Sequence, residues 1–142
     1  MTSKTWHYTI PGTPVTKKNH QSIIRAGGRP IIIQSKAYLE YEGICSYYLK
    51  DAPRDPLSGP VTVRCVYYMP TRRRVDLCNL MAATHDILVR WHILADDNRD
   101  VIASTDGSRV YYSKDAPRVE IEISPFDEPY TPFKTESKKK GR

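Results

Sequence analysis

The segment from Leu77 to Trp91 constrains the fold of this chain most, because its apolar residues recur at helical spacing. At about 100° per residue they fall within a stripe of roughly 120°, the pattern of a helix with one face on a core. Asp76 stands directly before the segment, where a carboxylate can cap a helix by accepting free backbone N–H groups. The pattern predicts a helix over residues 77–91 that begins at Asp76.

Alternating apolar and polar residues on both sides of this helix predict strands. They cover residues 6–10, 61–69, 101–105, 109–112 and 119–123. Two apolar runs around Ala26-Gly27-Gly28-Arg29 predict a hairpin within residues 21–34. Asp106-Gly107 is a favoured tight-turn dipeptide, so the strands on either side of it are expected to form a second hairpin.

A second helix is predicted near residues 36–50, where Ser35 can act as its cap and apolar residues again recur at helical spacing. The order of strands and helices is mixed. We therefore expect an α+β (mixed α/β) fold, a small mixed β-sheet flanked by two helices. Residues 1–124 are expected to form the folded domain, and residues 125–142, rich in proline and charge, a flexible basic tail.

The charge and cysteine content indicate which partners and which cellular compartment to expect. The 142 residues include 22 Lys and Arg against 16 Asp and Glu, and this net charge of +6 favours a polyanionic partner such as nucleic acid. The 3 cysteines show no metal-binding or disulfide spacing, which indicates a reducing compartment. No apolar run is long enough to cross a membrane. We expect a cytoplasmic protein without a membrane partner, in a prokaryotic or phage-type setting.

Acidic residues concentrate around the predicted helix of residues 77–91. Arg72, Arg73 and Arg74 precede a set of aspartates, namely Asp76, Asp86, Asp96, Asp97 and Asp100. Phosphodiester hydrolysis uses a hard cation to stabilise charge on phosphoryl oxygens, and magnesium takes carboxylate ligands. The block therefore predicts a magnesium-dependent phosphodiesterase, while the absence of a glycine-rich phosphate loop argues against a nucleotide cofactor.

Helix length limits how these aspartates can meet. A helix over residues 77–91 is about 21 Å long, so Asp76 and Asp97 at its two ends cannot share an ion through the helix itself. Either the loop after the helix returns to Asp76, or a second subunit completes the site. The sequence leaves both routes open.

The chain resembles the RusA family of Holliday-junction resolvases, the crossover junction endodeoxyribonucleases. The opening IPGTPVTKKN, the central RRRVDLCNL and ADDN, and the closing PRVEIEI carry the resemblance, which covers roughly residues 6–124. Asp76 falls on the family's first catalytic aspartate and Asp97 on its last, with Asp96 beside it. Asn79 falls on the asparagine of the motif, and Asp86 on an aspartate within the family's helix.

Two positions depart from the family's pattern. Cys78 stands where a second catalytic aspartate is usual, and Ala82 where a lysine is usual. Cysteine is too soft to replace a carboxylate on magnesium. Asp86, Asp96 or Asp106 is then expected to supply the missing carboxylate, and Lys17, Lys18 or Arg90 the missing cation.

The resemblance implies a structure-selective endonuclease that resolves four-way DNA junctions in recombination and repair, working as a homodimer. Asp76 and Asp97 would be catalytic and would hold magnesium, or manganese in its place, with Asp86 and Asp96. The residues expected to contact branched DNA are Arg72, Arg73, Arg74, Lys17 and Lys18. Two alternatives stay open: a catalytically attenuated junction-binding member of the family, and a general DNA-binding replication accessory protein whose tyrosines stack on bases.

Overall fold

A five-stranded mixed sheet forms the centre of the protein. The structure, a computed structural model, describes residues 4–17 and 21–128. Strand β1 (Trp6–Pro11) pairs antiparallel with β7 (Arg118–Pro125), which pairs antiparallel with the central β4 (Val61–Met69). The other edge of β4 carries β5 (Ile102–Ser104) and β6 (Arg109–Tyr112), both parallel to it. The expected mixed α+β fold is therefore confirmed.

The expected second hairpin is wrong. Strands β5 and β6 do not pair with each other, because β5 pairs with the beginning of β4 and β6 with its end. The chain between them does turn, since the Ser108 N–H donates to the Thr105 carbonyl at 3.1 Å. However, Gly107 has a positive φ of 87° and Asp106 does not, which is a type II turn. A tight hairpin of type I′ needs positive φ at both central residues, so this turn advances the chain along one edge of β4.

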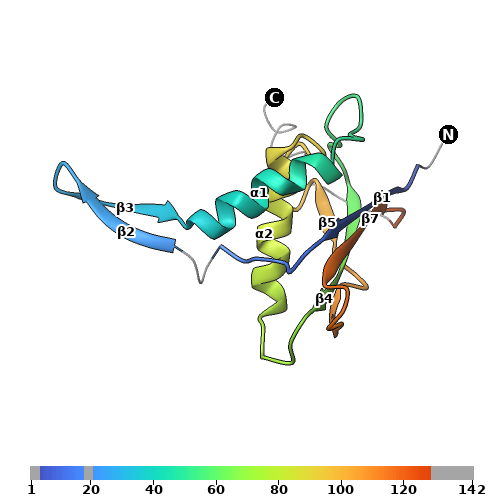
Figure 1. The fold of residues 1–142 in the computed structure, drawn as a ribbon. Helices are drawn as coiled ribbons and strands as arrows, with labels where there is room; N and C mark the ends of the chain where they lie inside the picture. Colours follow the sequence, from blue (N-terminus) through green and yellow to red (C-terminus); the bar gives the residue numbers. More distant parts are fainter. Residues whose placement is uncertain (1–3, 18–20, 129–142) are drawn as a thin grey trace, which may run out of the picture.

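Two helices cover the same face of the sheet (Figure 1). Helix α1 (Lys36–Tyr48) begins at Ser35, whose Oγ accepts the Tyr38 N–H at 3.0 Å. Helix α2 (Leu77–Arg90) begins at Asp76, as its sequence pattern predicts. The apolar stripe of α2 is buried, and the fully buried Tyr67 of β4 hydrogen-bonds to it. Within residues 4–17 and 21–128, the opposite face of the sheet carries no helix (Figure 1).

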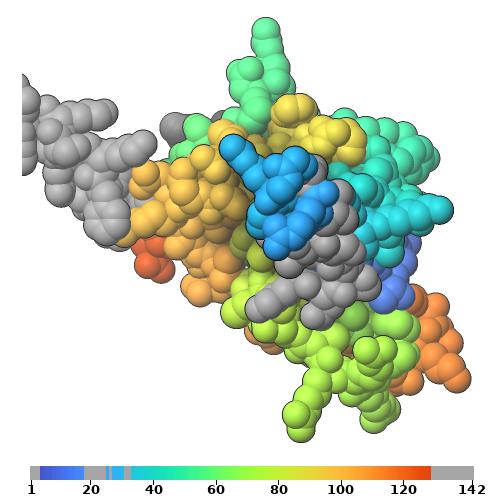
Figure 2. Space-filling view, turned by 90° about the vertical axis from the view of Figure 1, so that its left-hand side faces the viewer, coloured from blue at the N-terminus to red at the C-terminus, as the bar shows by residue number. Residues whose placement is uncertain are grey.

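The predicted first hairpin is confirmed. Strands β2 (Gln21–Ala26) and β3 (Arg29–Gln34) pair antiparallel as a separate two-stranded sheet. Gly27 and Gly28 both have positive φ, the requirement of a tight hairpin turn. The hairpin extends away from the main sheet (Figure 1) and points toward the viewer in Figure 2.

The last described residues stay attached to the sheet. Strand β7 runs to Pro125, and the Phe126 N–H donates to the Pro60 carbonyl at 3.0 Å. Residues 129–142 of the predicted tail lie outside the described residues. Among the residues that the structure describes, no helix is long and apolar enough to cross a membrane.

Candidate active site

A groove opens at the beginning of helix α2. One wall is the segment after β1, which runs along the helix, and the other is the loop that joins β4 to α2. The groove has a volume of about 810 Å³ and is lined by Thr13, Pro14, Val15, Thr16, Met69, Pro70, Thr71, Arg73, Arg74, Val75, Asp76, Asn79 and Leu80. One carboxylate, two guanidinium groups and an amide therefore face one hollow.

Asp76 has a capping role in this groove. Its Oδ1 accepts the N–H of Cys78 at 2.9 Å and that of Asn79 at 3.3 Å. Asp76 is exposed, so its other carboxylate oxygen remains open to solvent or a ligand. Capping and ligand binding are thus compatible at this residue.

The three arginines that are expected to contact DNA lie in the loop of residues 70–75, which we call the arginine loop. All three are exposed. Arg73 and Arg74 line the groove, whereas the Arg72 guanidinium lies 4.4 Å from the centre of the Tyr112 ring on strand β6. Figure 2 shows this loop in yellow-green, projecting at the lower end of the face. Guanidinium groups in this setting suit phosphate oxygens.

The other end of α2 is closed by a tight helix stop. His92 adopts a positive φ of 66°, its N–H donates to the Val89 carbonyl at 3.1 Å, and the Ile93 N–H donates to the Leu88 carbonyl at 2.9 Å. This Schellman arrangement reverses the chain. The Ala95 N–H then donates to the Leu57 carbonyl at 2.8 Å, which fixes the loop just before its aspartates.

Two aspartates beyond this stop, Asp96 and Asp97, gather with Asp86 of helix α2. Partial burial raises the pKa of Asp97, and the neighbouring charges of Asp86 and Asp96 raise it further. Hydrogen-bond contacts of its side chain with both neighbours act in the same direction. One Asp96 oxygen accepts the Asp97 N–H at 2.7 Å and the other accepts from the Asn98 amide at 3.2 Å, so Asp96 is held in place.

A lysine reaches the same cluster from a distant part of the chain. Lys17 Nζ lies 2.8 Å from Asp86 Oδ2, and both side chains are about one-third exposed, at 31% and 37%. Lys17 follows directly on the segment that walls the groove. Lys17 is one of the residues expected to replace the cation that is missing at Ala82. Its ammonium group already forms an ion pair with a carboxylate of the cluster. Lys18 lies outside the described residues.

The structure separates Asp76 from the other aspartates. Asp86 lies ten residues along α2 from Asp76, which is roughly 15 Å of helix axis. Within residues 4–17 and 21–128, no three acidic, histidine or cysteine side chains are already spaced to hold one ion. Cys78 is exposed near Asp76 and belongs to no such group.

Tyr38 is a member of this neighbourhood that the sequence pattern does not reveal. It is buried in the core, and its ring centre lies 5.7 Å from Lys17 Nζ. Burial raises the pKa of Tyr38, and the charges of Glu42 and Asp86 add to that effect. Its partnership with Lys17 and Asp86 depends on tertiary packing of α1 against α2.

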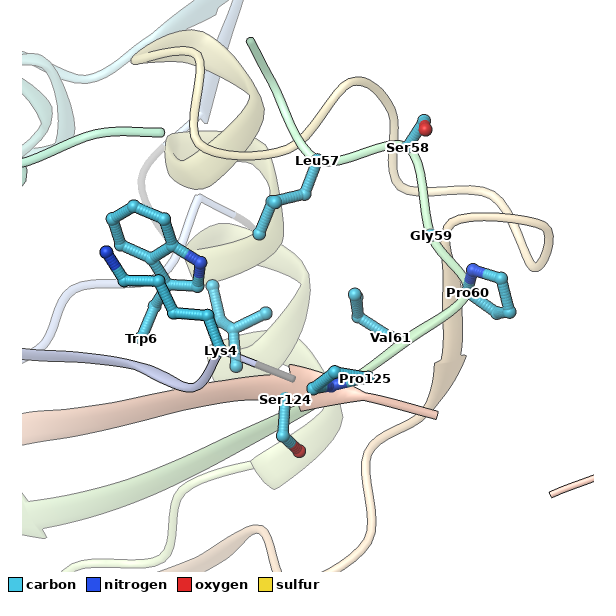
Figure 3. A pocket seen from close by; sticks show the side chains of 10 residues that line it. Lys4, Trp6, Leu57, Ser58, Gly59, Pro60, Val61, Ser124 and Pro125 are labelled. Atoms are coloured by element: carbon cyan, nitrogen blue, oxygen red, sulfur yellow. The ribbon is translucent and has the colours of Figure 1, made fainter. Parts of the chain in front are cut away.

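A second hollow, of about 270 Å³, lies away from this acidic neighbourhood. Figure 3 shows Trp6, Leu57 and Val61 around it, with the Lys4 ammonium 3.9 Å from the Trp6 ring centre. None of its lining residues is an acid, a histidine or a cysteine. This hollow therefore offers no carboxylate, imidazole or thiolate that could hold a metal ion.

Comparison with known proteins assigns the family. The family described as Endodeoxyribonuclease RusA matches residues 11–124, which include the groove, α2 and the acidic cluster. The chain belongs to the RusA family. No curated protein sequence matches it. The RusA match makes this chain a member of an endodeoxyribonuclease family, and it places Asp76 and Asp97 inside the matched region.

Proposed function

We propose that this RusA family member is a magnesium-dependent endonuclease that cuts four-way DNA junctions. The observation that carries the proposal is the acidic cluster at Asp97, which lies in the matched region of an endodeoxyribonuclease family. The net charge of +6 supports a polyanionic substrate. The cluster would act on phosphates that the groove and the arginine loop hold.

The donor chemistry of the cluster fits magnesium. Asp86, Asp96 and Asp97 offer only carboxylate oxygens, the ligands that magnesium takes in proteins. The raised pKa of Asp97 reflects partial burial and the negative charges of Asp86 and Asp96 beside it, an effect that a divalent cation would relieve. Magnesium bound there would stabilise charge on the phosphoryl oxygens and activate the attacking water. Lys17 supplies one positive charge to this acidic set.

Asp76 is proposed to act together with Asp97, as in the family. Because the two residues lie near opposite ends of α2, a second subunit is one way to bring them to one phosphate. We propose a homodimer, since a four-way junction has two-fold symmetry and paired incisions need two matching sites. Arg73 and Arg74, in the groove with Asp76, would then position the DNA backbone.

Junction cleavage by single variants tests the proposal. The variants Asp76→Asn and Asp97→Asn are incubated with a labelled four-way junction and magnesium, and the products are separated on a denaturing gel. We expect both to lose cleavage, by about 100-fold or more, while junction binding survives. Asparagine caps a helix as well as aspartate does, so Asp76→Asn removes the charge without unfolding α2. Asp55→Asn, an exposed acid in the loop before β4, is the matched control and should cut normally.

Metal binding provides a readout that does not depend on activity. Magnesium should raise the melting temperature of the wild type and of Asp55→Asn but not that of Asp97→Asn. Normal cleavage by Asp97→Asn, or an equal thermal response to magnesium in all three proteins, would remove the basis for this site.

An attenuated junction-binding protein is the second candidate. The exposed Cys78 and the alanine at position 82 favour it, because both stand where the family has working groups. Binding without incision, in manganese as well as in magnesium, would select this candidate. Faster cutting by Cys78→Asp than by the wild type would show that the lost carboxylate limits the rate.

A further inference from the structure

The face of the sheet opposite the helices carries a row of aromatic and cationic side chains. Arg118 of β7, Tyr68 of β4 and Tyr111 of β6 stand directly opposite one another in the strand register. Directly paired residues project on the same face of a sheet. These three side chains therefore lie side by side on the open face, close to the end of β4 that leads into the arginine loop.

The contacts within this row are those of stacked rings. The Arg118 guanidinium lies 3.8 Å from the centre of the Tyr68 ring, and the Tyr68 and Tyr111 ring centres are 5.5 Å apart with their planes tilted by 34°. Tyr68 is thus half-buried between two neighbours. Tyr111, at the outer end of the row, is 46% exposed. A large part of one aromatic ring is left uncovered at the edge of the sheet.

Arg109 provides a positive charge beside that ring. It lies two residues before Tyr111 on β6, so both project on the same face. Its Nη1 donates to the Tyr111 hydroxyl at 3.3 Å and its Nε to the Gly107 carbonyl at 3.1 Å.

The carboxylates on the same face are already neutralised. Glu120 pairs with Arg118 and Glu122 with Arg64, whereas Arg109 has no carboxylate partner among the ion pairs of the described residues. The free charge beside Tyr111 is therefore positive.

We propose that Tyr111, with Tyr68, Arg109 and Arg118, forms a stacking platform for unpaired DNA bases. An exposed ring offers a base a stacking surface without sequence preference, and a guanidinium that no described carboxylate neutralises suits the adjoining phosphate. Strand β6 is an edge of the sheet and also carries Tyr112, which contacts Arg72 on the other side. The arginine loop lies between the groove and the platform, so a strand bound at one could continue to the other. The platform contains none of the acids proposed for cleavage.

Binding of a single-stranded oligonucleotide tests the platform apart from the acidic site. Fluorescence anisotropy is measured in EDTA for a labelled single strand and for a duplex of equal length. Replacing Tyr111 with alanine should weaken binding of the single strand by about 5-fold or more, the effect of losing one stacked base, and leave duplex binding unchanged. Tyr111→Phe keeps the ring and should bind as the wild type does. The measurement is made without magnesium and scores binding alone, so failure of the proposed cleavage site would leave this result intact.

Tyr47 provides a matched control on helix α1. It is 61% exposed, its ring lies 5.0 Å from that of Tyr48, and Lys50 Nζ lies 4.1 Å from its centre. Tyr47→Ala therefore removes an exposed aromatic ring beside a cation from another surface and should not change binding. Unchanged single-strand affinity in a folded Tyr111→Ala, equal losses in Tyr47→Ala, or an equal loss in Tyr111→Phe would each overturn the proposal. Photo-crosslinking to 5-bromouracil in the single strand should in addition modify Tyr111 in the wild type, and labelling only elsewhere would count against it.

Discussion

At the scale of single residues, Asp97 combines a proposed role in metal binding with an unfavourable charge. Its pKa is raised above the ordinary value of 3.8 by partial burial and then by Asp86 and Asp96. A raised folded-state pKa means that the stabilising contribution is present only at low pH and is lost as the pH rises through that pKa. At neutral pH the ionised carboxylate therefore costs stability.

The variant Asp97→Asn should consequently be more stable than the wild type in EDTA at neutral pH. We expect a gain below about 1 kcal/mol, because exposed charges interact weakly. The gain should disappear well below pH 3.8, where the Asp97 carboxyl is protonated in both the folded and the unfolded protein. Urea unfolding followed by circular dichroism across this range measures it. Equal stability of the two proteins at every pH would show that the neighbouring carboxylates do not repel Asp97.

The sequence predicts which residues carry charge at the site, but not which of them meet. Asp86 follows Leu77 by nine residues, which at helical spacing places it on the opposite side of the helix, and it is partly exposed as that spacing requires. Its contact with Lys17 joins residues 69 positions apart, so no local pattern contains it. The grouping of Asp97 with Asp86 depends on the helix stop at His92, where a residue other than glycine adopts positive φ.

At the scale of elements, one buried hydrogen-bond chain joins the sheet to helix α2. The Thr84 hydroxyl donates to the Leu80 carbonyl at 3.0 Å, so it must accept from the Tyr67 hydroxyl, which lies 2.7 Å away. Tyr67 is fully buried, and burial raises the pKa of its phenol strongly.

Replacing Thr84 with valine keeps the volume but leaves the Tyr67 hydroxyl buried without its partner. This should lower the free energy of unfolding by about 1–3 kcal/mol. Adding Tyr67→Phe to Thr84→Val removes the orphaned hydroxyl and should restore most of that loss. Urea denaturation of Thr84→Val, Tyr67→Phe and the double variant gives the values. A double variant that is less stable than the sum of the two single changes would contradict the assigned hydrogen bond.

The elements that the sequence predicts well are those fixed by local pattern. Helix α2 begins at its predicted aspartate and buries its predicted stripe, because capping and amphipathic spacing are both properties of neighbouring residues. The error at strands β5 and β6 has the opposite cause. Their partner is β4, some 40 residues earlier in the chain (Ser108 Oγ accepts the Cys65 N–H across 43 positions), so turn residues alone could not reveal parallel pairing.

At the scale of the whole molecule, positive charge gathers at the end of β4. Arg72, Arg73 and Arg74 in the arginine loop, Arg109 on β6 and Arg118 on β7 lie on the elements that meet there. The loop of residues 51–60 with its exposed Arg54 lies at the opposite end in Figure 1. The two ends of β4 therefore differ in positive charge. Removing arginines from the more positive end should reduce phosphate contacts more than removing Arg54 from the other end.

The salt dependence of junction binding measures this asymmetry. Each lost phosphate contact on duplex DNA lowers the slope of log affinity against log salt by about 0.9. The double variant Arg73→Ala and Arg74→Ala should therefore reduce the slope by about 2 for each bound subunit, and it should weaken binding of all junction sequences alike. Arg54→Ala removes an exposed arginine from the other end and should leave the slope unchanged. If the slope decreases equally in both variants, DNA binding depends on the overall net charge of +6 rather than on the arginines of the groove. A loss confined to Arg73 and Arg74 would instead place the DNA backbone beside Asp76, where the proposed chemistry needs it.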